Sequence, residues 1–121
     1  MAIVSTILTC LVALIHAYIL WFEMFAWESR GPKVFTGFPK DLFPPTKQMA
    51  ANQGLYNGFL AAGLIWAVLV DEPNWQANIA LFFLACVAIA GIFGAVTASR
   101  KTLYVQTAPA VLAAIAILLG L

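Results

Sequence analysis

Four long apolar runs dominate this chain and leave little sequence for any other structure. They cover about residues 3–27, 51–70, 77–98 and 103–121 of a total of 121. A helix needs roughly 20 residues to cross the hydrocarbon layer of a membrane. Only 9% of the residues are charged, against about 25% in an average soluble domain. The sequence therefore predicts an all-α integral membrane protein, with residues 1–121 forming one domain of four transmembrane helices.

The connections between the runs predict an up-down-up-down four-helix bundle. The second connection, Asp71 to Trp75, and the third, Ser99 to Thr102, are both short. Short connections make consecutive helices antiparallel neighbours. We therefore expect the first and third connections to lie on the same side of the membrane.

Basic residues indicate which side that is. All six lie in the first and third connections: Arg30, Lys33, Lys40, Lys47, Arg100 and Lys101. Because basic loops stay in the cytoplasm, we expect both chain termini outside and the segment 28–50 at the cytoplasmic side. The lipid bilayer is the expected partner, and no basic surface indicates a nucleic acid.

The segment 28–50 is the one long connection. Its prolines at positions 32, 39, 44 and 45 exclude a continuous helix. It is nevertheless rich in apolar side chains, namely Val34, Phe35, Phe38, Leu42, Phe43 and Met49. Such a segment fits a strip at the lipid headgroup level, a loop packed over the helix ends, or a lid over a cavity in the membrane.

Seven polar side chains in the apolar runs are candidate site residues. They are His16 and Glu23 in the first run, Asn52, Gln53, Tyr56 and Asn57 in the second, and Gln106 in the fourth. An ionisable group in the hydrocarbon costs about 3 kcal/mol or more, so it normally faces the bundle interior. The runs beginning at residues 51 and 103 enter from the cytoplasmic side, so these groups are expected in the cytoplasmic half of the bundle. This arrangement predicts a polar pocket that opens toward the cytoplasm.

Helix geometry predicts which of these groups can meet. His16 and Glu23 are seven residues apart, on one helix face and about 10.5 Å apart along the axis. A ligand or water would therefore have to bridge them. Asn52 and Gln53 are expected near the level of Glu23, and Asn57, one turn deeper, near His16.

These residues suit a site for a small amphipathic or apolar ligand. His16 and Glu23 would be the candidate catalytic acid and base, and Asn52, Gln53, Tyr56, Asn57 and Gln106 would bind the ligand. Plainer interpretations remain open: Glu23 could reach the interface and pair with Arg30, His16 could hydrogen-bond a neighbouring helix, and the amides could only join helices. Whether the site turns over a substrate is also open.

Two other classes of function stay open. A proton-coupled transporter would resemble the small multidrug exporters, which use a glutamate embedded in their first helix. Those exporters insert in both orientations, whereas the charge bias here favours one. A non-catalytic assembly subunit would use the polar residues only to specify helix pairing. No metal site is expected, because His16 and Glu23 lack a third ligand, and the sequence does not specify a cofactor.

Small residues predict close helix packing. Gly54 and Gly58 form a GxxxG pattern, and Ala90, Gly94 and Ala98 repeat at four-residue spacing. Such faces let helix backbones approach each other in a membrane, either within one chain or between copies in a homo-oligomer. Pro109 is expected to kink the fourth run, with Thr107 or a neighbouring helix satisfying the freed backbone groups.

Three stretches carry a family resemblance: HAYILWFEMFAW at residues 16–27, NQGLYNGFLAA at 52–62 and VQTAP at 105–109. They resemble signatures of a family of small bacterial membrane proteins with four helices, the domain of unknown function thirteen-oh-four. The resemblance covers nearly the whole chain. It implies a multi-pass protein of the bacterial inner membrane and points to His16, Glu23, Asn52, Gln53, Asn57 and Gln106, without implying a reaction.

Overall fold

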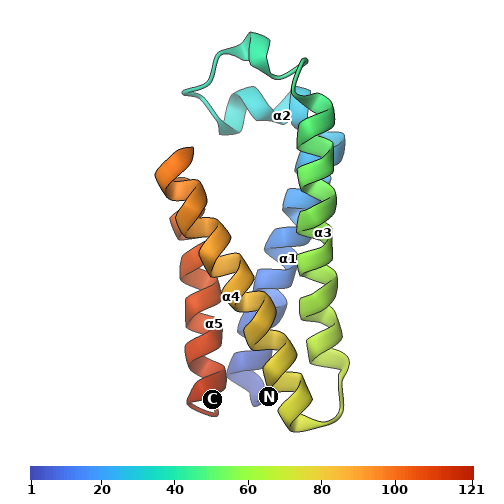
Figure 1. The fold of residues 1–121 in the computed structure, drawn as a ribbon, viewed down its shortest axis with the longest axis vertical. Helices are drawn as coiled ribbons and strands as arrows, with labels where there is room; N and C mark the ends of the chain where they lie inside the picture. Colours follow the sequence, from blue (N-terminus) through green and yellow to red (C-terminus); the bar gives the residue numbers. More distant parts are fainter. The chain divides into compact units, whose positions relative to one another are not determined.

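The computed structural model describes residues 1–121, and every regular element in it is helical (Figure 1). The elements are α1 (Ile3–Phe25), α2 (Trp27–Val34), the 3₁₀ turn η1 (Lys40–Leu42), α3 (Lys47–Leu69), α4 (Pro73–Thr97), the π-helical segment η2 (Leu103–Thr107) and α5 (Ala108–Leu118). The prediction of an all-α protein is confirmed.

The four apolar runs correspond to α1, α3, α4 and η2 with α5, but two helices begin earlier than predicted. α3 begins at Lys47 and α4 at Pro73. The start of α4 has a clear cause, since the Glu72 carboxylate accepts hydrogen bonds from the backbone N–H groups of Asn74 (3.1 Å) and Trp75 (2.8 Å). This side-chain cap satisfies donors that a helix start otherwise leaves without partners.

Two helices, α1 and α4, are long and apolar enough to cross a membrane, and Leu103–Leu118 is a shorter apolar helical stretch. α3 has the same length as α1. Its first half, however, carries Lys47 and the amide side chains Gln48, Asn52, Gln53 and Asn57, which lower its mean hydropathy.

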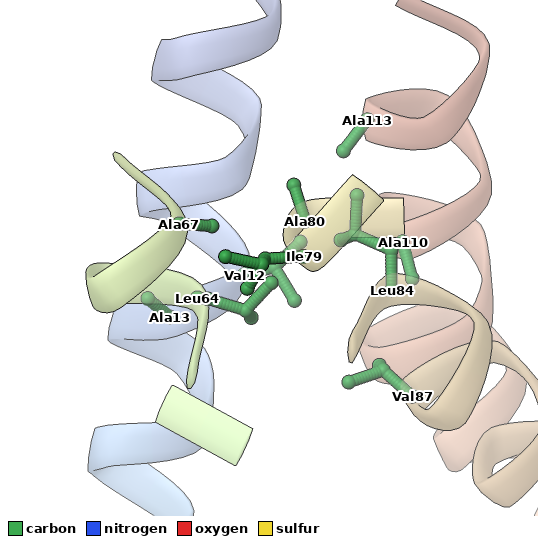
Figure 2. Close-up of a cluster of buried hydrophobic side chains, with 10 residues drawn as sticks. All are labelled: Val12, Ala13, Leu64, Ala67, Ile79, Ala80, Leu84, Val87, Ala110 and Ala113. Carbon is green, nitrogen blue, oxygen red and sulfur yellow. The ribbon is translucent and has the colours of Figure 1, made fainter. Parts of the chain in front are cut away.

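The chain divides into two compact units, and α1 and α3 contribute to both. Residues 1–15 and 60–121 form one, the core unit, and residues 16–59 form the other, the polar unit. In the core unit, side chains from α1, α3, α4 and α5 meet in one apolar cluster (Figure 2). Its members are Val12, Ala13, Leu64, Ala67, Ile79, Ala80, Leu84, Val87, Ala110 and Ala113.

Within the core unit, α4 runs antiparallel to η2 and α5 and packs closely against η2. The Thr107 hydroxyl donates to the backbone oxygen of Ala88 (3.0 Å), and the Thr102 hydroxyl donates to that of Gly91 (2.9 Å). Gly94 also faces Thr102. The close contact thus follows Gly91 and Gly94, whereas Ala90 and Ala98 of the predicted four-residue stripe are exposed.

Pro109 lies in the first turn of α5, directly after η2. Here the helix takes the wider π register, in which the N–H of Ala108 donates to the oxygen of Leu103. Such a register change often accompanies a break in the ordinary helical hydrogen-bond pattern. The predicted role of Thr107 needs correction, because its hydroxyl joins η2 to α4 through Ala88.

The long connection folds onto the helix ends of the polar unit. At Ala26 the backbone leaves the helical region (φ −130°, ψ 18°), and α2 then runs across the direction of α1 and α3 (Figure 1). Trp27 is the centre of an aromatic cluster with Phe22, Phe35 and Phe43, whose ring centroids lie 5.7, 5.9 and 5.1 Å from its own. Its indole N–H donates to the Thr46 hydroxyl (2.9 Å).

This cluster accounts for only part of the apolar content of residues 28–50. Phe43 is buried, whereas Phe38, Leu42 and Met49 are exposed. The interpretation as a loop packed over the helix ends therefore holds for Phe43. The three exposed side chains stay available for an interface.

Candidate functional site

The polar groups of α1 and α3 meet at Glu23 and Asn57. The side-chain amide nitrogen of Asn57, Nδ2, donates to Oε1 of Glu23 (2.7 Å) and to the backbone oxygen of Gln53 (3.0 Å). Both Glu23 and Asn57 are half-buried. This hydrogen bond joins two helices through residues that are 34 positions apart in the sequence.

The bond leaves two oxygen atoms of the pair without a donor from the chain. A carboxylate and a backbone carbonyl can only accept, so Nδ2 of Asn57 supplies both hydrogen bonds and its Oδ1 supplies neither. Glu23 uses only Oε1. The pair thus presents Oδ1 and Oε2, two acceptors that suit a group with N–H or O–H donors.

Two glycines explain why the helices come close enough for this bond. A Cβ atom at Gly54 would lie 3.1 Å from the backbone oxygen of Leu20 and 3.0 Å from Cβ of Glu23. A Cβ atom at Gly58 would overlap the side chain of Leu20. The predicted close-packing face is therefore used inside the chain, between α1 and α3.

The predicted depth of Asn57 needs correction, because Asn57 bonds Glu23 and not a group near His16. The prediction set Gln53 level with Glu23 and Asn57 one turn deeper, whereas the Asn57 side chain itself reaches Glu23. The glycine contacts then set the register, with Gly58 opposite Leu20. His16 lies seven residues before Glu23 on α1 and is completely buried (0% exposed). Its proposed role as an acid or base stays a prediction.

Of the other predicted ligand-binding residues, three lie in the polar unit and one lies in the core unit. Asn52, Gln53 and Tyr56 have exposed side chains, and the Tyr56 ring makes an edge contact with Phe59 (5.8 Å between centroids). Gln106 belongs to η2 in the core unit and is half-buried.

A shallow pocket of about 290 Å³ lies elsewhere in the polar unit. It is lined by Met24, Phe25, Trp27, Glu28, Ser29 and Lys47, so none of the predicted site residues contributes to it. Glu28 and Lys47 form an ion pair there (3.4 Å). The sequence offered no signal for this pair, because only the folded connection brings these two residues together.

The suggested ion pair between Glu23 and Arg30 is not formed. Glu28 and Lys47 form the ion pair of this region, and the guanidinium of Arg30 lies over aromatic rings of α1 instead. Sequence reasoning missed this contact. The available signal was an arginine following a stretch with Tyr18 and Trp21, at the expected membrane boundary.

Comparison with known proteins finds a matching family model and a relative that aligns with nearly the whole chain. Residues 10–118 match the family model described as "Protein of unknown function (DUF1304)". The chain is also 33% identical over 117 residues to the "Uncharacterized protein YpaA" of Lactococcus lactis subsp. lactis (strain IL1403), an alignment that covers 95% of this chain and 97% of that protein. No solved structure matches the chain. The chain therefore belongs to the DUF1304 family of proteins of unknown function.

Proposed function

We propose that this protein spans the membrane four times, through α1, α3, α4 and the η2–α5 segment. The exposure of its apolar helices supports this proposal. Only 28% of the most apolar window is buried in α1, and the same fraction is buried in α4. The core helix of a soluble protein would hide most of such a surface, since large exposed apolar patches indicate an interaction with a membrane or a partner. Lipid chains would cover this surface.

The charge distribution predicts the orientation of these spans. Alkaline phosphatase fused after Leu121 should be active in a bacterial host, whereas the same enzyme inserted after Lys40 should be inactive, because basic loops stay in the cytoplasm. Green fluorescent protein at the same two positions should show the opposite pattern. Equal activity at both positions would contradict a single orientation and would favour the exporter-like alternative.

Within this membrane protein, Glu23 and Asn57 form a binding site for a small amphipathic molecule that donates hydrogen bonds. The hydrogen bond between Asn57 Nδ2 and Glu23 Oε1 carries this proposal. It holds a carboxylate and an amide side by side. Oε2 of Glu23 and Oδ1 of Asn57 take no part in the hydrogen bonds of the pair. An ammonium, amide or hydroxyl group of a ligand would donate hydrogen bonds to these two oxygens. His16, two turns away on α1, would take part in acid–base chemistry only through a bound ligand that reaches both residues.

Glu23→Gln is expected to weaken binding of dansylcadaverine, a fluorescent primary ammonium amphiphile, by at least tenfold. A glutamine keeps an oxygen that can accept from Asn57, so the contact between α1 and α3 remains. It removes the negative charge, and hydrogen bonds to charged groups contribute about 1.5–3 kcal/mol. Fluorescence anisotropy of the probe with the full chain in detergent micelles measures the affinity.

Glu28→Gln is the matched control. Glu28 is an exposed glutamate in the same unit, paired with Lys47, and its loss should leave probe binding unchanged. If Glu23→Gln binds the probe as tightly as the unchanged protein, the site is not a ligand site. The Glu23–Asn57 bond would then serve only to join helices, as in an assembly subunit.

A further inference from the structure

Two aromatic rings on the exposed side of α1 hold the guanidinium of Arg30. Its guanidinium carbon lies 5.9 Å from the ring centroid of Tyr18 and 5.9 Å from that of Trp21. The two rings are in contact with each other (5.8 Å between centroids), and Tyr18 also stacks on Phe22 (6.4 Å). A cation over an aromatic face is attracted to the ring electrons, so the guanidinium is positioned without a carboxylate.

The hydrogen-bonding capacity of Arg30 is not used within the chain. The nearby Glu28 is paired with Lys47, and the side-chain N–H groups of Arg30 donate to no acceptor of the chain. Tyr18 and Trp21 are 46% and 44% exposed. A planar guanidinium has five N–H donors in a geometry that matches phosphate oxygens. The surface therefore combines a positioned anion-binding group with exposed rings beneath it.

The depth of this group identifies the source of the phosphate. Tyr18 lies seven residues before Phe25, the last residue of α1, which is about 10.5 Å along the helix axis. The Arg30 side chain thus folds back from α2 along the side of α1. In the membrane placement proposed above, Trp21, four residues or about 6 Å before the end of α1, would lie nearer the boundary between hydrocarbon and headgroups, and Tyr18 would lie deeper. The guanidinium would lie beside them, just inside the headgroup level, where a cation draws in lipid headgroups by thinning the bilayer locally; the phosphate of an inner-leaflet lipid is then the anion within its reach.

A second positive charge follows on the same helix. Lys33 is exposed and lies three residues after Arg30 on α2, so the two side chains are neighbours on the helix surface. Two adjacent cations favour a ligand with net negative charge over a zwitterionic one, since a choline group would be repelled.

We propose that Arg30, with Tyr18 and Trp21, forms a site for the phosphate of an anionic glycerophospholipid, whose acyl chain lies along the exposed apolar face of α1. This inference rests on the membrane placement and is independent of the Glu23–Asn57 ligand site. It assigns α2 a role as an interfacial helix that presents its cations to the inner leaflet.

Native mass spectrometry of the full chain in detergent tests the site. With equal amounts of dioleoylphosphatidylglycerol and dioleoylphosphatidylcholine, the unchanged protein is expected to retain the anionic lipid preferentially. Arg30→Gln should reduce this preference about fivefold, the effect of one cation near an anionic lipid surface. Trp21→Leu should reduce it as well, because the ring no longer positions the guanidinium.

Arg100→Gln is the control, because Arg100 is an exposed arginine of another connection and its loss should change the preference little. If Arg30→Gln keeps the preference, or if Arg100→Gln lowers it equally, the site is overturned. Soluble sn-glycerol 3-phosphate should not displace the lipid; displacement at equal concentration would assign the site to a free phosphate ester and contradict the proposal. Dansylcadaverine binding and the fusion pattern should be unchanged in Arg30→Gln, so failure here is separate from failure of the proposed function.

Discussion

Gly91→Val is expected to lower the apparent unfolding temperature of the protein by about 10 °C or more. A Cβ atom at this position would lie 2.9 Å from the backbone nitrogen of Thr107 and would overlap its hydroxyl oxygen. Overpacking of this kind costs about 1–3 kcal/mol. The displaced Thr107 would also lose its hydrogen bond to Ala88, and a buried polar group without its partner costs about 1–3 kcal/mol more. Together these losses correspond to a shift of that size in a domain of this length.

Circular dichroism of the full chain in detergent, followed on heating, measures this shift. Ala90→Val is the matched control, because it places the same valine side chain at the neighbouring position of α4, which is exposed. It should unfold at nearly the same temperature as the unchanged protein. Equal unfolding temperatures for the two variants would show that α4 and η2 do not approach as closely as described.

Phe43→Ala is expected to open the connection between α2 and α3 and to speed its cleavage by trypsin at least tenfold. Phe43 is 2% exposed, packs on Trp27 and lies so close to Gly31 that a Cβ atom there would overlap its ring. Replacing a buried phenylalanine with alanine costs about 3–5 kcal/mol. Local opening exposes backbone to proteases in proportion to its equilibrium population, and 1.4 kcal/mol already corresponds to a factor of about ten.

Mass spectrometry of the fragments released after Lys33 and Lys40 follows this cleavage over time. Phe38→Ala is the control, because Phe38 belongs to the same connection but is exposed. Its cleavage rate should stay within about twofold of the unchanged protein, as expected for a surface substitution. If Phe43→Ala is cleaved no faster than Phe38→Ala, the aromatic cluster does not hold the connection in place.

The helical fold was predictable because the length and hydrophobic content of each segment indicate a helix without knowledge of the other segments. Each apolar run is long enough to form a helix. The prolines at 44 and 45 precede the start of α3 at Lys47, whereas α1 ends at Phe25 without a proline and Pro32 lies inside α2. The helix starts were less predictable. Glu72 extends α4 to Pro73 through a side-chain cap, and the polar first turns of α3 from Lys47 are helical although they are not apolar.

The sequence predicted which residues belong to the candidate site, but not which of them contact each other. Glu23 and Asn57 stood out because polar groups are costly in an apolar segment. Their mutual hydrogen bond depends on the register between α1 and α3, which the contacts of Gly54 and Gly58 decide. The contact of Arg30 with Tyr18 and Trp21 was also not predictable from the sequence, because it depends on the turn at Ala26.

By itself, the sequence determined the class of this protein: an all-α chain with apolar helices, basic residues confined to two connections, and a few polar groups that mark α1 and α3. Those properties follow from the composition of each segment and need no knowledge of its neighbours. Only the tertiary structure decided which groups meet, namely Glu23 with Asn57, Gly91 with Thr107, and Arg30 with two aromatic rings. Such contacts depend on helix register and on a folded connection, and these are set by close packing between residues far apart in the chain.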